Sequence, residues 1–183
     1  MELEETLSLD AIRAVGRGTT ELAIVGENTP SEGLQSFLCD RDELVVLFPA
    51  GHPAAAPGVI EREAALRFDL VGLSRSTSLM RQLAGLAESC GQTLRIRVQL
   101  RNFDAVWRMV SAGIGVAIVP RAAGAPHVKS MGLSLVRFAG PPVERRLLLV
   151  SREDRMLSPP ALAFVELARS RMATALNRPY SPR

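Results

Sequence analysis

Residues 101–120, RNFDAVWRMVSAGIGVAIVP, contain a helix pattern that passes into a strand pattern with almost no loop between them. Asn102 is a candidate helix N-cap. Four apolar residues fall at i, i+3, i+4 and i+7 and so share one helix face: Phe103, Val106, Trp107 and Val110. Gly113 can adopt the left-handed conformation that ends a helix, and Gly115 permits a tight reversal. The apolar run at 116–120 then predicts a buried strand, and so short a joint is typical of α/β folds.

The remainder of the chain repeats this alternation of helical and extended patterns. Short apolar runs predict strands at 21–26, 42–49, 69–73, 94–100, 133–138 and 144–151. Helical patterns predict helices at 6–18, 61–68, 74–91 and 158–176. We expect Ser8 to be the N-cap of the first helix, and the run at 21–26 to be a buried parallel strand. Strands that alternate with helices predict the α/β class of fold.

Composition and charge exclude several classes of protein. The sequence has no apolar run of the roughly 18 residues that a membrane span needs. Its acidic start, MELEETLSLD, does not resemble a secretion signal, so we expect a cytoplasmic protein with no membrane partner. The formal charge of +3 is too small and too dispersed for direct nucleic-acid binding by this chain. Residues 178–183 are expected to form a disordered tail.

Motifs for catalysis and metal binding are missing from the sequence. His52 and His127 stand in proline-flanked loops without the HExxH spacing, and there is no GxSxG elbow or phosphate loop. Cys39 and Cys90 show no CxxC spacing, so we expect two ordinary thiols, no disulfide and no zinc site. The acidic segment DRDE at 40–43 is interpreted as a solvated turn before a strand. We therefore expect no enzyme activity, no cofactor and no metal.

Six stretches of the sequence occur in an order and spacing that resemble a known family. They are GRGTTELAIV, LCDRDELVVLFPAGHPAA, LVGLSRSTSLMRQL, VSAGIGVAIVP, ERRLLLVS and LSPPALAFVELAR. The strongest pairing joins DELVVLFPAGHP with the later AGIGVAIVP. The series resembles the effector-binding domain of LysR-type transcriptional regulators.

The resemblance implies an α/β fold of the type II periplasmic-binding-protein kind, with two lobes joined by two crossover strands. It places lobe one at 1–50 plus 150–177 and lobe two at 57–145. Family members begin with a winged helix-turn-helix and a linker helix. By resemblance, this chain is N-terminally truncated and begins at about the domain's second strand. A mis-annotated start is our first explanation; a fragment, or a partner that supplies the missing strand and pairs its backbone groups, are the others.

The resemblance also implies a ligand-binding cleft lined by the beginnings of helices, whose free N–H groups suit polar or anionic effectors. The candidate ligand-binding residues are Thr6, Ser8, Gly26, Glu27, Ser74, Ser76, Thr77, Asn102 and Phe103. Simple helix capping is the alternative role of the hydroxyl and amide residues in this set. Glu27 would oppose a carboxylate effector unless it points away or pairs with Arg75. We expect Trp107 to belong to the core, while Phe103 is open to either role.

The function implied by the resemblance is that of a sensor in transcription regulation. A small-molecule effector bound between the lobes would control transcription, and DNA would be contacted only through a helix-turn-helix domain absent from this chain. A homo-oligomer, either a dimer or a tetramer, is expected. Two alternatives remain: an enzyme of the same two-lobed fold, such as a prephenate dehydratase-like protein, and a solute-binding protein. The enzyme would need convergent titratable groups, whereas the candidates here are mostly hydroxyls.

Overall fold

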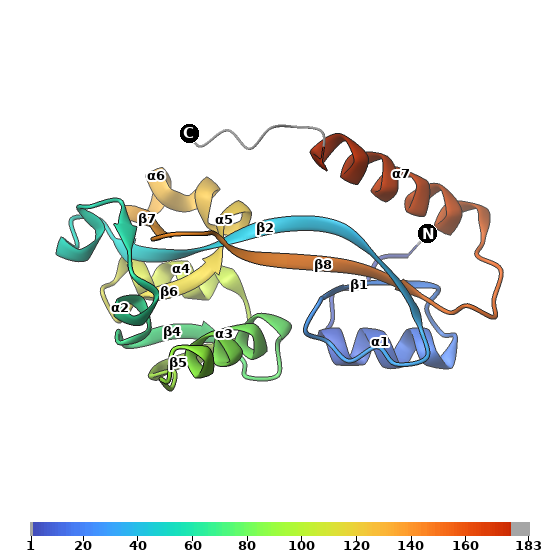
Figure 1. Ribbon diagram of the computed structural model, residues 1–183, viewed down its shortest axis with the longest axis horizontal. Helices are drawn as coiled ribbons and strands as arrows, with labels where there is room; N and C mark the ends of the chain where they lie inside the picture. Colours follow the sequence, from blue (N-terminus) through green and yellow to red (C-terminus); the bar gives the residue numbers. More distant parts are fainter. Residues whose placement is uncertain (1, 177–183) are drawn as a thin grey trace. The chain divides into compact units, whose positions relative to one another are not determined.

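The computed structural model describes residues 2–176, the last four of them as helix backbone only (Figure 1). The chain divides into two compact units. Unit 1 comprises Met1–Arg41 with Arg146–Arg183, and unit 2 comprises Asp42–Arg145. The lobe boundaries expected from the resemblance stay a prediction, and the expected tail at 178–183 lies outside the described residues. Within the described part, no helix is long and apolar enough to cross a membrane.

Two strands connect the units. β2 (Gln35–Pro49) begins in unit 1 and ends in unit 2, and β8 (Val143–Ser151) runs from unit 2 back into unit 1. The hydrogen-bonded order β1-β8-β2-β7-β3 contains both of them. These are the two crossover strands that the resemblance implied, and the mixture of helices and strands confirms the α/β class.

Unit 1 has a small core around one strand. Its elements, besides parts of β2 and β8, are α1 (Ser8–Arg17), β1 (Leu22–Gly26) and α7 (Pro159–Leu176). The cluster of buried apolar residues in this unit consists of Val15, Ala23, Val25 and Val150. The prediction of a buried parallel strand at 21–26 is wrong, because β1 pairs antiparallel with β8 and Ile24 is 50% exposed. A continuous apolar run does not reveal that the strand is exposed on one side, at Ile24.

The beginning of α1 also differs from the prediction. Leu7, not Ser8, is the N-cap, and no side chain caps this helix. The backbone carbonyl of Leu7 accepts from the N–H groups of Asp10 and Ala11, at 2.9 Å each. The helix therefore starts one residue earlier than its hydroxyl pattern suggested, because backbone bonds alone close the first turn.

Unit 2 contains a mixed sheet covered by helices. Its strands, besides the ends of β2 and β8, are β3 (Val59–Ile60), β4 (Leu70–Leu73), β5 (Ile96–Leu100), β6 (Ala117–Pro120) and β7 (Leu133–Phe138). Its helices and 3-10 turns are η1 (Pro53–Ala55), α2 (Arg62–Leu66), α3 (Ser78–Ser89), α4 (Phe103–Ser111), α5 (Arg121–Gly124), η2 (Ala125–His127) and α6 (Val128–Met131). β2 pairs antiparallel with β6 and β7, β7 pairs parallel with β3, and β4 pairs parallel with β5. A bridge between Leu70 and Val116 joins the β4–β5 pair to the chain entering β6.

The segment 101–120 has the predicted structure. Asn102 is the N-cap of α4, and Gly113 adopts a positive φ of 72° after the helix. Trp107 is 1% exposed and belongs to the core of unit 2, as expected. Gly115 enters the sheet so closely beside β4 that an added Cβ would lie 2.5 Å from the carbonyl oxygen of Asp69. This close approach is what lets the helix pass into the strand without a loop.

The strand β2 is longer than predicted. It begins at Gln35, so the acidic segment at 40–43 lies inside the strand and the interpretation as a solvated turn is wrong. Charged residues are tolerated there because successive strand side chains point to opposite faces, where each can find a separate partner. The carboxylate of Asp42 accepts from the backbone N–H groups of Glu43 and Ala122, at 2.7 and 3.1 Å.

Candidate functional site

The parallel pair β4 and β5 brings two candidate segments to one edge of unit 2. Leu73 lies opposite Leu100 in the register, so the residues that follow both strands are neighbours. The N–H of Ser74 donates to the carbonyl of Leu100 at 3.0 Å, and that of Arg75 donates to Gln99 Oε1 at 3.4 Å. Because α3 and α4 start just beyond these strand ends, both helix beginnings lie at this edge. We call it the β4–β5 edge.

The hydroxyl groups just before α3 have different roles: one caps the helix, and two others form hydrogen bonds that the helix does not need. Thr77 is the N-cap: its Oγ1 accepts from the N–H of Met80 at 3.3 Å and donates to the carbonyl of Ser74 at 2.9 Å. The hydroxyls of Ser74 and Ser76 lie 2.9 Å apart and bond to each other. A hydroxyl offers one donor and two acceptors, so this exposed pair retains hydrogen-bonding capacity that the helix does not use.

The beginning of α4 combines a cap with an aromatic stack. The Oδ1 of Asn102 accepts from the N–H of Ala105 at 3.0 Å, so its capping role is confirmed. The ring of Phe103 stacks on Trp107 with centroids 5.0 Å apart and planes at 6°. Trp107 in turn stacks on His127 at 5.6 Å. Phe103 is only half-buried, so part of its side chain remains open to solvent.

A small apolar cavity lies beneath this edge and does not itself hold a metabolite. Its walls come from β4, α3, α4 and β6, with Phe103 and Met80 among the lining residues. It has room for about one water molecule, whereas small-molecule sites usually measure several hundred Å³. The cavity is therefore too small to be the candidate ligand site by itself.

Arg145 is a candidate residue that the sequence analysis missed. Its Nη2 donates to the Oγ of Ser78 at 3.0 Å, and its Nη1 donates to the Oε1 of Gln82 at 3.3 Å. Gln82 is itself anchored, because its Nε2 donates to the carbonyl of Glu144 at 2.6 Å. Burial lowers the pKa of the Arg145 guanidinium, against a smaller opposing effect of Asp42. The two consecutive arginines ahead of the apolar run LLLV were the available signal.

Two candidate ligand-binding residues of unit 1, Gly26 and Glu27, lie at the end of β1. Gly26 ends β1, and its carbonyl accepts from the N–H of the buried Thr29 at 2.9 Å. Glu27 forms an ion pair with Arg146 at 2.6 Å, so the partner is not the Arg75 that was considered. This pairing was not visible in the sequence because β8 delivers Arg146 from 119 positions away. It offsets part of the negative charge of Glu27.

The two remaining candidates of unit 1 stand at the start of the chain. Thr6 is exposed and precedes α1, and Ser8 is half-buried as the first residue of that helix. Neither side chain caps α1. Their part in ligand binding stays a prediction, as does the expected cleft between two lobes.

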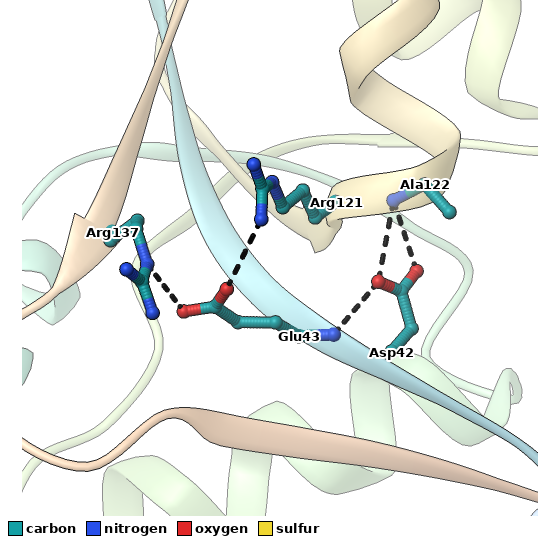
Figure 2. A network of polar contacts seen from close by, with 5 residues as sticks. All are labelled: Asp42, Glu43, Arg121, Ala122 and Arg137. Carbon is teal, nitrogen blue, oxygen red and sulfur yellow. Dashed lines mark hydrogen bonds and ion pairs between the residues drawn. The ribbon is translucent and has the colours of Figure 1, made fainter. Parts of the chain in front are cut away.

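A network of charged residues in unit 2 has a structural role (Figure 2). Glu43 of β2, whose side chain is 11% exposed, pairs with Arg137 of β7 at 2.9 Å and lies 4.0 Å from Arg121. Asp42 binds the N–H of Ala122 at the beginning of α5. These contacts tie β2 to β7 and to the short helix after β6. Within residues 2–176 no group of three or more potential ligands is placed to hold a metal ion.

Cys39 is not an activated cysteine. Cys39 is half-buried and donates to the carbonyl of Leu147 at 3.4 Å. Burial raises the pKa of the Cys39 thiol to about 11, and Asp40 adds to this effect. Because the thiolate is the reactive form, this residue is poorly suited to redox chemistry.

Comparison with known proteins identifies the family. The model of the LysR substrate binding domain matches residues 1–173, so the chain belongs to this family. The family consists of regulator domains and not of enzymes, which sets aside the enzyme alternative.

Among the curated relatives is a probable nitrogen assimilation transcriptional activator of Synechococcus elongatus, 28% identical over 93% of this chain and 57% of its own length. Another is a probable RuBisCO transcriptional regulator of Cyanophora paradoxa, 24% identical over 83% of this chain and 49% of its own. The chain thus spans about half the length of these relatives.

Solved structures show the same fold. The regulatory domain of CcmR from Synechocystis PCC6803, in complex with 2-PG, superposes with a TM-score of 0.81 at 19% identity and covers 96% of this chain and 83% of that one. The effector-binding domain of QuiR, in complex with shikimate, gives a TM-score of 0.79 at 20% identity and covers 89% and 77%. The predicted fold of the type II periplasmic-binding-protein kind is therefore confirmed.

Proposed function

We propose that this chain is the effector-binding part of a LysR-type transcriptional regulator and that the β4–β5 edge binds a small polar metabolite. The observation that carries the proposal is the convergence of two helix beginnings with spare hydroxyls at one edge. Ser74 and Ser76 offer donors and acceptors, and the half-buried Phe103 offers an apolar surface. Support comes from two structural neighbours of the same fold, whose complexes contain shikimate and 2-PG.

A thermal-shift screen of small polar metabolites, including shikimate and 2-PG, tests the proposal. A binder should raise the melting temperature with increasing concentration, because binding to the folded state alone adds to the free energy of unfolding. In the double variant Ser74→Ala/Ser76→Ala, the Kd of that binder should rise by about tenfold or more, since two hydrogen bonds are lost.

The matched control is Ser89→Ala at the other end of α3, where the hydroxyl donates to the carbonyl of Leu86 at 2.7 Å. This variant should bind like the parent protein. The proposal fails if no metabolite raises the melting temperature, or if the double variant and the control bind the same ligand equally well.

For the whole regulator we propose a cytoplasmic homodimer or tetramer that contacts DNA through a winged helix-turn-helix domain. Effector binding would change the affinity or the geometry of that contact. Support comes from the curated relatives, which are named as transcriptional regulators. A gel-shift assay of the whole gene product on its own promoter, with and without the ligand found above, should show an effector-dependent change. An identical shift in both conditions would contradict this part of the proposal.

A further inference from the structure

Arg145 is a partly buried cation whose neighbours within unit 2 do not neutralise it. Its two hydrogen-bond acceptors, Ser78 Oγ and Gln82 Oε1, are both neutral. Among the described residues, no carboxylate lies within ion-pair distance of its guanidinium. Burial is the larger influence on its pKa and lowers it, which means that the charged form is disfavoured where it sits.

Two other partly buried arginines of the same chain lie in direct contact with a carboxylate. Arg137 lies 2.9 Å from Glu43, and Arg146, the next residue after Arg145, lies 2.6 Å from Glu27. The acidic group with a noticeable effect on Arg145 is Asp42, whose carboxylate accepts from two backbone N–H groups. Arg145 therefore differs from these two arginines by the lack of a carboxylate in direct contact, a feature that it shares with Arg62.

The surroundings of Arg145 add positive potential. Ser78 is the first residue of α3, a helix of 12 residues whose beginning carries partial positive charge. A buried cation in such a place lowers stability unless a counter-charge is supplied.

Arg145 has further N–H donors that could bind such a counter-charge. A guanidinium has five N–H donors in a planar fork, and the hydrogen bonds of Arg145 to Ser78 and Gln82 use two of them. The Nε of Arg145 is not among the buried unpaired atoms of the described residues, so this further donor is not enclosed without a partner. The hydroxyls of Ser74 and Ser76 lie just ahead of the same helix turn.

We propose that Arg145 binds the anionic group of the effector, a carboxylate or a phosphate, together with the hydroxyls of Ser74 and Ser76. This inference rests on the proposed function and narrows it to one chemical class of ligand. The geometry of a guanidinium suits either anion, because both present two oxygens to its parallel N–H groups. Gln82 and Ser78 then act as positioning residues that hold the guanidinium in place.

The test compares Arg145→Gln with the parent protein and with Arg97→Gln, an exposed arginine on β5 that lies 4.0 Å from Asp69. The probes are inorganic phosphate and malonate, each against sodium chloride at matched ionic strength, with glycerol as the uncharged probe. Phosphate or malonate should raise the melting temperature of the parent and of Arg97→Gln. In Arg145→Gln, the Kd of that anion should rise about tenfold to a hundredfold.

A second readout separates anion binding from a purely structural role. In dilute chloride buffer without the probes, Arg145→Gln should melt at the same temperature as the parent or higher, because an uncompensated charge is removed while a hydrogen-bonding side chain is kept. A lower melting temperature together with unchanged anion affinity would assign Arg145 a structural role and overturn the inference. So would a parent protein that responds to neither phosphate nor malonate.

The outcomes also distinguish this inference from the proposed function. If the parent binds an uncharged metabolite and Arg145→Gln binds it equally well, the sensor function stands and the inference of an anionic effector is wrong. If no metabolite of any charge binds, the proposed function itself fails.

Discussion

Arg145 and Arg146 are neighbours in the sequence, yet their guanidinium groups have opposite surroundings. Arg146 forms an ion pair with Glu27 in unit 1, whereas Arg145 bonds only neutral side chains in unit 2. Successive side chains of a strand point to opposite faces, so one strand can serve two environments. The point where β8 passes from one unit to the other is therefore also the point where two arginines have different roles.

Gly115 supports the most specific prediction at the residue scale. Gly115→Ala should lower the free energy of unfolding by about 2–3 kcal/mol, because the new Cβ would lie 2.5 Å from a backbone oxygen that cannot move aside cheaply. The control is Gly85→Ala in α3, where nothing lies within 4 Å of an added Cβ. That variant should be more stable by about 0.5–1 kcal/mol, since alanine favours helix. Urea unfolding measures both, and equal midpoints would contradict the packing described for β6.

At the scale of elements, the strand β2 stabilises unit 2 through a charged residue as well as through its buried apolar residues. Leu44 to Phe48 are fully buried, and the preceding Glu43 is nearly so. Its carboxylate joins β2 to β7 through Arg137 (Figure 2). A pair with so little exposure matters more to stability than an exposed pair, because losing one partner leaves the other charge poorly solvated.

Glu43→Gln should therefore lower the free energy of unfolding by about 1–2 kcal/mol, a figure reduced for the partial exposure of Arg137. Asp10→Asn, which removes an exposed ion pair with Arg13 on α1, should change it by less than about 0.5 kcal/mol. Chemical denaturation of the two variants measures the contrast. Similar losses in both would show that the β2–β7 pair is no stronger than a surface contact.

The beginning of α7 supports a pH-dependent prediction. Glu21 accepts from the N–H and the hydroxyl of Ser158, at 2.6 and 2.7 Å, just before α7 starts. These bonds lower the pKa of Glu21 below its usual value of 4.5. A carboxylate with a lowered pKa in the folded state stabilises the protein above the unfolded pKa and loses that effect as the pH falls.

Glu21→Gln should thus melt below the parent at pH 7, and the gap should close as the pH falls below about 4. Glu32→Gln, at an exposed site of the same unit, serves as the control and should track the parent throughout. Melting curves from pH 3 to pH 7 make the comparison. A gap that stays constant with pH would mean that the charge of Glu21 is not what holds Ser158.

At the scale of the whole molecule, the two units have cores of very different size. The buried cluster of unit 1 has four members, whereas that of unit 2 extends over β2, β4, β6, α3 and α4. Large apolar residues remain exposed in unit 1, among them Leu3, Ile24 and Met156. Free energies of local opening follow buried apolar contact, so the units should not be equally protected.

Hydrogen exchange measured by mass spectrometry should show this difference. Amides of β1 should exchange faster than those at 44–48 of β2, by at least about tenfold, because less apolar contact holds β1 in place. Peptides from β6, also in unit 2, provide the internal control and should be as protected as 44–48. Equal protection of β1 and β6 would contradict this account of stability.

The sequence by itself determined the features that depend on short-range patterns. The helix-to-strand joint at 101–120, the cap at Asn102 and the position of α7 follow from spacing and from residues with strong local preferences. The order of such segments also determined the family, and with it the fold. The hydroxyls of the β4–β5 edge were found for the same reason, since residues that begin a helix after a strand are adjacent in sequence.

Only the tertiary structure decided the features that depend on distant partners. β1 is antiparallel because β8 supplies its neighbour, Glu27 pairs with an arginine 119 positions away, and the acidic residues before Leu44 lie within a strand. Arg145 emerged as a candidate only when its lack of a contacting carboxylate could be seen. Burial and ion pairing depend on which residues surround a side chain in space. Those neighbours are distant in the sequence, so a local sequence pattern does not reveal them and only the folded chain does.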